Sequence, residues 1–180
     1  LYHGQRDTIQ AIGGNYNPWL GVTREIGNLE RDLGQYDHPA PHADILIGAS
    51  LFVTDRFLSE VGLLGEDYFL YYEEHDWAER GRGKGWELRV VPECVVYHKQ
   101  GASIGGGRDR GNKSALSDFF SFRNKLLFTA RYFPWCLPSV YIGLLGAALR
   151  RIQRRQWNRL PMLFTLMFTF FTKPRFKSTP

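Results

Sequence analysis

The chain has 180 residues and a net charge of +5 at pH 7, and this length allows one folded core or part of a domain followed by a tail. The positive excess is confined to the C-terminal tail, which argues against a nucleic-acid-binding face. The basic residues of the tail are Arg150, Arg151, Arg154, Arg155, Arg159, Lys173, Arg175 and Lys177. Two cysteines without metal-binding or framework spacing exclude a disulfide scaffold.

The first part of the chain predicts short strands and one long loop. Residues 8–14 indicate a strand that runs into a Gly-Gly turn. Residues 16–41 are rich in Gly, Asn, Asp and Pro without periodicity, which is typical of a surface loop that carries function. Two compact apolar strands are predicted at 45–47 and 50–53, with Gly48-Ala49 as the break between them.

Two helices are predicted next. Thr54 is a good N-cap for a helix over residues 55–61, which Gly62 ends. A second helix is expected over residues 74–84 and is closed by Gly85.

Two further strands are expected at 86–91 and 95–98, and they are interrupted by Pro92. Residues 99–114 are glycine-rich and basic, so they predict either a mobile lid over an anionic ligand or a linker. An amphipathic helix over residues 115–133 follows.

The tail holds two apolar runs, 138–149 and 160–172, which are separated by a cluster of arginines. Each run is shorter than the roughly 20 residues that a membrane-spanning helix needs. They fit an interfacial or re-entrant hairpin whose arginines meet anionic headgroups on the cytoplasmic side. The alternative is a buried helical pair. Apolar residues on all sides of the second run favour the membrane.

The densest group of chemically capable side chains lies between residues 73 and 98. Glu73, Glu74 and Asp76 crowd the start of the second predicted helix, and His98 ends a later predicted strand. Ligands of open α/β sheets bind beyond the carboxyl ends of the strands, so these groups predict a metal-assisted transfer site. The alternative is a solvated acidic helix start.

The order of these segments resembles the family 2 inverting glycosyltransferases, and most closely their bacterial rhamnosyltransferase-like subgroup. The residues that carry the resemblance are Gly48-Ala49-Ser50, the run 60–76, and Val91-Pro92 leading to His98. It extends from the start of the chain to about Arg123-Asn124, and its several parts in order make it more specific than a single short motif.

The resemblance implies an α/β fold: a partial GT-A type, Rossmann-like three-layer domain followed by a helical, membrane-associating tail. Residues 1–114 would be the acceptor-binding and catalytic-base half, and residues 115–180 the tail. In these enzymes a nucleotide-binding half with an Asp-x-Asp metal motif precedes this region, and this sequence contains no Asp-x-Asp. We therefore expect the chain to begin inside a longer enzyme and to be inactive alone.

The resemblance also assigns catalytic roles. The family pattern reads Glu-Asp-x-Asp, and its second acid, the base, corresponds to Glu74, which is one methylene longer than the usual residue. Glu73 would orient the acceptor, and Asp76 would cap the helix or hold Arg80 four residues on. His75 lies outside the pattern and is expected at the surface or against the acceptor.

Substrate and metal contacts are assigned in the same way. The small turn Gly48, Ala49 and Ser50 would let a sugar approach the backbone. Sugars would stack on Tyr72 and Trp77, Lys99 and Ser103 would contact the diphosphate, and His98 would bind a divalent Mg or Mn ion.

The predicted function is inverting, metal-dependent transfer of a sugar from a nucleotide-diphosphate donor to a lipid-linked or cell-surface glycan. The subgroup implies rhamnose as the sugar, the cytoplasmic face of the bacterial inner membrane as the location, and no nucleic-acid partner. One alternative is a non-catalytic, membrane-tethered glycan-binding or scaffold domain. Another is a metal-dependent hydrolase built on Glu74 and His98.

Overall fold

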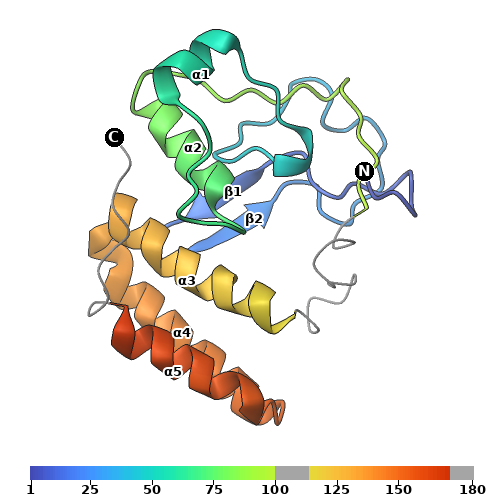
Figure 1. Cartoon of the computed structure of the whole chain (residues 1–180). Coiled ribbons are helices and arrows are strands. Elements are labelled where there is room, and N and C mark those ends of the chain that lie inside the picture. Colours follow the sequence, from blue (N-terminus) through green and yellow to red (C-terminus); the bar gives the residue numbers. More distant parts are fainter. Residues whose placement is uncertain (100–113, 171–180) are drawn as a thin grey trace.

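A computed structural model describes residues 1–99 and 114–170, and these residues form a mixed α/β arrangement (Figure 1). In chain order the elements are β1 (Gly14–Asn17), β2 (Val22–Glu25), α1 (Asp55–Val61), α2 (Glu73–Arg82), α3 (Ala115–Tyr132), α4 (Leu137–Gln153) and α5 (Leu160–Thr169). Helix α3 contacts α2 on one side and both α4 and α5 on the other. It therefore joins the β1–β2 and α1–α2 part of the molecule to the last two helices.

Strands β1 and β2 form an antiparallel hairpin in which Gly14 pairs with Glu25 and Asn17 with Val22. The side chain of Asn17 accepts a hydrogen bond from the backbone N–H of Leu20 at 3.2 Å, which stabilises the turn. The prediction of an irregular loop over residues 16–41 is wrong here. Each strand has only four residues, which is too few for an alternating pattern to stand out.

The other predicted strands do not form ladders in the described part of the chain. Two isolated bridges mark where they touch the rest: Ile45 pairs with Gly14, and His98 pairs with Tyr2. Of the strand predicted over residues 8–14, Gly14 begins β1 and Thr8 forms an isolated bridge with Arg31. Apolar runs indicate burial, but a strand also requires a neighbour to bond with. The predicted strands that form no ladder are residues 45–47, 50–53, 86–91 and 95–98.

The helix predictions are confirmed closely. Helix α1 has the predicted bounds, with the backbone N–H of Phe57 donating to Oγ1 of Thr54 at 3.1 Å and Gly62 in a positive-φ conformation (φ 84°). Helix α2 begins at Glu73, one residue earlier than predicted, and ends at Arg82.

Helices α4 and α5 cover the two apolar runs of the tail and pack against α3. Their shared core consists of Leu126, Val140, Leu144, Ala148 and Leu163. Within the described ranges, none of the helices is both long and apolar enough to cross a bilayer.

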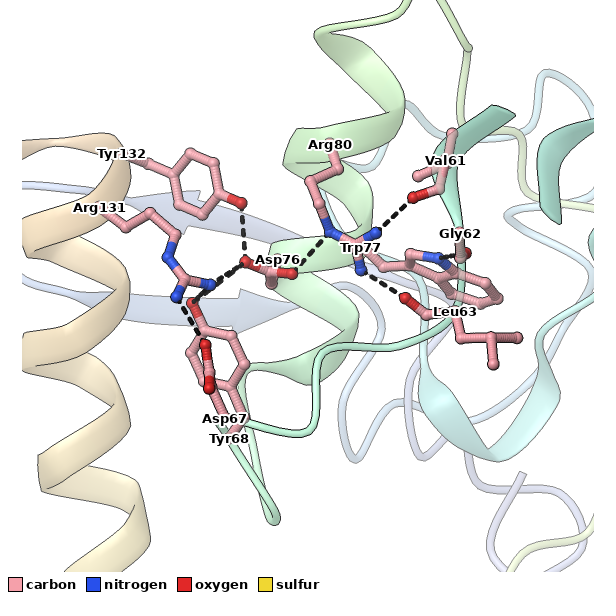
Figure 2. A network of polar contacts seen from close by, with 10 residues as sticks. All are labelled: Val61, Gly62, Leu63, Asp67, Tyr68, Asp76, Trp77, Arg80, Arg131 and Tyr132. Carbon is pink, nitrogen blue, oxygen red and sulfur yellow. Dashed lines mark hydrogen bonds and ion pairs between the residues drawn. The ribbon is translucent and has the colours of Figure 1, made fainter. Parts of the chain in front are cut away.

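The carboxylate of Asp76, which is 1% exposed, is the centre of a polar network between α2 and α3 (Figure 2). Its Oδ1 accepts hydrogen bonds from the hydroxyl of Tyr132 at 2.7 Å, Nη1 of Arg131 at 2.9 Å and the hydroxyl of Tyr68 at 3.3 Å. Its Oδ2 accepts from Nε of Arg80 at 2.8 Å. Burial raises the pKa of Asp76, but the donors outweigh burial and hold that pKa below its ordinary value. The predicted Asp76–Arg80 pair is thus confirmed.

A second polar residue of α3, the fully buried Asn124, holds the loop that leads into α2. Its Nδ2 lies 2.7, 2.7 and 2.9 Å from the carbonyl oxygens of Tyr68, Leu70 and Tyr71. Three aromatic residues of this loop have left-handed backbones, namely Phe69, Tyr71 and Tyr72. Each such residue costs about 1–2 kcal/mol, so the loop depends on these contacts to keep its shape.

We expect Asp76→Asn to lower the free energy of unfolding by about 3 kcal/mol or more, because Arg80 and Arg131 would lose the partner that offsets their burial. Urea denaturation followed by circular dichroism measures the change. The matched control is Glu87→Gln, which breaks an exposed ion pair with Arg89 and should cost no more than about 0.5 kcal/mol. Equal effects of the two substitutions would contradict this view of Asp76.

Candidate functional site

A cavity of about 810 Å³ lies beside the start of α2. Its other walls come from the N-terminal segment, from the segment before α1 and from the segment after α2. Six of the residues assigned to the site line it: Gly48, Ala49, Ser50, Glu74, Trp77 and His98. The structure therefore brings the proposed base, the small turn and the histidine to one cavity, although they are far apart in the sequence. Its size suits a small ligand such as one or two sugar rings.

Glu74 is in the first turn of α2, and its side chain lies against Gly48. A Cβ atom on Gly48 would overlap Oε1 of Glu74 and would lie 3.0 Å from its Cδ. The turn Gly48–Ser50 was expected to be small so that a sugar could approach the backbone. In the structure the glycine at its start is required by the Glu74 side chain instead.

The surroundings of Glu74 change its acidity. Burial raises the pKa of Glu74 to about 7, and the charge of Glu73 raises it as well, while backbone N–H groups of Glu74 and Gly48 offset part of the increase. A carboxylate with this pKa can accept a proton and release it near neutral pH, as a general base must.

Glu73 precedes Glu74 in α2 but does not line the cavity. Burial raises the pKa of Glu73 above its ordinary value, and its Oε2 is buried without a hydrogen-bond partner in the described part of the chain. In the structure Glu73 therefore acts on Glu74 through its charge.

His75 is enclosed by aromatic rings and is not the surface residue that we expected. Its ring centroid lies 4.6 Å from that of Tyr72 and 5.6 Å from those of Tyr16 and Phe128. Its Nε2 lies 2.7 Å from Oγ1 of Thr23. Burial, aided by the charge of Arg82, lowers the pKa of His75 to about 4, so the ring is neutral at physiological pH.

Two of the assigned residues lie in the core beneath the cavity. The hydroxyl of Tyr72 donates to the carbonyl oxygen of Gly21 at 2.8 Å, and Asp76 is held in the network between α2 and α3. Neither lines the cavity. Trp77 lines its wall, but its Nε1 donates to the carbonyl oxygen of Gly62 at 2.9 Å and its ring packs on Phe57. The structure thus gives Asp76 and Tyr72 supporting positions away from the cavity.

His98 is held by the N-terminal segment. Its Nδ1 lies 3.0 Å from Oε1 of Gln10, and its backbone N–H donates to the carbonyl oxygen of Leu1 at 3.0 Å. No three His, Cys, Asp or Glu side chains of residues 1–99 and 114–170 gather where they could hold a metal ion. These residues do not fit a divalent ion by themselves.

The remaining assignments concern the diphosphate contacts. Lys99 is exposed and does not line the cavity. Ser103 and most of the predicted lid lie outside the described residues.

Gln10 is a residue of the site that our sequence analysis missed. It lines the cavity with its neighbours Ile9, Ala11 and Ile12, and its side chain contacts the ring of His98. The signal was a polar side chain in the middle of an otherwise apolar predicted strand.

Comparison with known proteins identifies no relative: no protein-family model, no curated protein and no solved structure matches this chain.

We expect Gly48→Ala to displace the carboxylate of Glu74 without unfolding the protein, because the overlapping atom is the far end of a flexible side chain. The pKa of Glu74 should then fall from about 7 toward its ordinary value. Carbon-13 NMR titration of labelled glutamate carboxyl groups measures this shift.

Adding Glu74→Asp to Gly48→Ala shortens the acid by one methylene and should restore a raised pKa at position 74. The control is Gly143→Ala, at a site where an added Cβ meets nothing within 4 Å. An unchanged titration in Gly48→Ala would show that the glycine does not position the acid.

Glu74→Gln should raise stability at neutral and alkaline pH. Folding raises the pKa of Glu74 from 4.5 to about 7, so the stability that the wild type has below pH 4.5 is lost as pH rises through 7. The variant has no charge to bury. We expect its free energy of unfolding above pH 7 to exceed that of the wild type by on the order of 2 kcal/mol.

Chemical denaturation at a series of pH values measures this difference, which should vanish below pH 4.5. The control Glu66→Gln, which changes an exposed carboxylate, should show no such pH dependence. A constant difference at all pH values would mean that Glu74 titrates normally.

Proposed function

We propose that this chain supplies the acceptor-binding side and the general base of an inverting glycosyltransferase. The observation that carries the proposal is the position of Glu74, a partly buried carboxylate with a pKa of about 7 that lines a cavity of about 810 Å³. Residues with such shifted pKa values gather at functional sites. The resemblance of residues 48–98 to family 2 glycosyltransferases supports the same assignment from the sequence.

In this mechanism an acceptor sugar occupies the cavity, with Trp77 and the Gly48–Ser50 turn as parts of its wall. The carboxylate of Glu74 removes the proton from the acceptor hydroxyl as its oxygen attacks the anomeric carbon of the donor. The carbon–oxygen bond to the nucleotide diphosphate breaks on the opposite face, so the configuration inverts. The electrostatic effect of Glu73 keeps Glu74 basic enough to hold the proton that it has taken.

The proposal extends to a GT-A type fold and to a divalent Mg or Mn ion at the diphosphate. The mixed α/β content supports the fold. His98 could contribute one ligand to such an ion, and further ligands would have to come from outside the described residues. Bound there, the ion would neutralise the leaving diphosphate, and no step above depends on it.

The partners that we propose are a nucleotide-diphosphate sugar, with rhamnose as the first to test, and a lipid-linked or polysaccharide acceptor. An acceptor on a lipid would place the reaction at the cytoplasmic face of the bacterial inner membrane.

In the full-length protein, Glu74→Gln should lower turnover by about a hundredfold or more while acceptor binding stays nearly unchanged, because only proton transfer is lost. Wild-type turnover should fall as pH drops below about 7, where Glu74 becomes protonated. Transfer of radiolabelled rhamnose from its deoxythymidine-diphosphate form to a lipid-linked glycan measures both effects.

Glu66→Gln serves as the matched control and should keep wild-type turnover. A large loss from Glu73→Gln with a mild effect of Glu74→Gln would move the base by one residue. Acceptor binding without measurable transfer by any full-length preparation would favour the non-catalytic glycan-binding alternative.

A further inference from the structure

Helix α4 carries an apolar stripe on its outer side that no described part of the chain covers. Its members are Ile142, Leu145, Leu149 and Ile152, which are 38 to 69% exposed. Their spacings of three and four residues place them along one face of the helix. The opposite face, with Val140, Leu144, Ala147 and Ala148, is buried. Helix α4 is therefore apolar on two faces but is packed on only one.

The charge of the chain changes sign after Asp118, in the first turn of α3. Residues 1–118 hold 12 Lys and Arg against 18 Asp and Glu, whereas residues 119–180 hold 11 Lys and Arg and no acid. The stripe therefore belongs to a segment without any carboxylate of its own. A negatively charged surface is the partner that complements this segment.

The structure also shows which arginines of the tail are exposed and which pair with a buried carboxylate. Arg151 and Arg159 donate to Oδ2 of the buried Asp118, at 2.7 and 3.2 Å. They connect the end of α4 and the turn after it to α3. Arg150, Arg154 and Arg155 are exposed at the C-terminal end of α4. Arg151 therefore does not belong to the predicted cluster of headgroup-binding arginines, because it pairs with Asp118 inside the protein.

Tryptophans flank the helix in the sequence. Trp135 precedes α4 and Trp157 follows it, and both are more than half exposed. Indole rings favour the boundary between headgroups and acyl chains, where their apolar body and polar N–H are both accommodated.

From these observations we infer that α4 lies flat on a bilayer that contains anionic lipids. The stripe of Ile142, Leu145, Leu149 and Ile152 enters the acyl boundary, and the exposed arginines contact the headgroups. This surface lies on α4, whereas the sequence favoured the second apolar run, residues 160–172, as the part that meets the membrane. In α5, Leu163 and Leu166 are buried in the helical core, and of the described residues of this run Phe164 and Phe168 stay exposed. The inference concerns α4 and does not depend on the proposed transferase activity.

The test is binding of the purified full chain to vesicles of phosphatidylcholine with and without phosphatidylglycerol, measured by co-sedimentation. The wild type should bind the anionic vesicles and lose affinity as salt is added. Leu145→Gln combined with Leu149→Gln should reduce that affinity by about tenfold or more, because less apolar surface enters the bilayer. Arg150→Gln combined with Arg154→Gln should reduce it by about 25-fold.

Matched controls lie in the N-terminal part of the chain. Leu33→Gln with Leu63→Gln changes two leucines that are more exposed than those of the stripe, and Arg31→Gln with Arg89→Gln changes two exposed arginines. Both double variants should bind anionic vesicles as the wild type does. Circular dichroism verifies that every variant retains its helices.

Two outcomes would overturn the inference. Equal binding of the stripe variant and the wild type would show that the α4 surface does not insert. Self-association of the wild type in sedimentation velocity experiments, abolished by the same stripe substitutions without any vesicle binding, would identify the surface as a contact between copies of the chain.

Discussion

The burial of one carboxylate, that of Asp76, is the constraint on which the rest of this structure depends. A charged group in the interior is stable only when donors surround it. Here the donors come from the loop before α2, from α2 itself and from the end of α3. Helices that are distant in the sequence must therefore meet at a single point. Because Asp76 is two residues from Glu74, the same contacts set the position of the candidate base.

The candidate site contains several features that cost stability. Glu74 keeps a raised pKa, Glu73 has a buried oxygen without a described partner, and the adjoining loop holds three aromatic residues in left-handed conformations. Strain and poor solvation of this kind persist only where the surroundings impose them, and they gather at functional sites. The network around Asp76 and the clamp by Asn124 are the surroundings that impose them here. The hydrogen bonds of Asp76 and Asn124 thus hold in place the groups that cost stability.

Asp118 has a corresponding role at the other side of α3. It is the last acidic residue of the chain, and it is buried between Arg151 and Arg159. These two ion pairs connect α3 to the end of α4 and to the turn before α5. Their formation removes two positive charges from the surface, whereas Arg150, Arg154 and Arg155 stay exposed. One buried carboxylate therefore determines both how the last helices pack and which of their charges can meet a partner.

The sequence correctly predicted the features that depend only on residues close together in the chain. The N-cap at Thr54, the stop at Gly62 and the i, i+4 pair of Asp76 and Arg80 are contacts between residues close in the sequence, and all were predicted. The strands were not, because a strand exists only with a partner that the local sequence does not identify. The function assigned from the sequence remains our proposal, since it depends on a resemblance.

The sequence by itself determined the helices, their caps and the residue types available for chemistry, because these depend on neighbours within one or two turns. Only the tertiary structure decided that Glu74 meets Gly48 at a cavity, that Asp76 and Tyr72 lie beneath it, and that His75 is enclosed among aromatic rings. It also decided which arginines of the tail stay exposed. The physical reason is that burial and charge pairing involve groups dozens of residues apart, and the acidity of a side chain follows from what surrounds it in space.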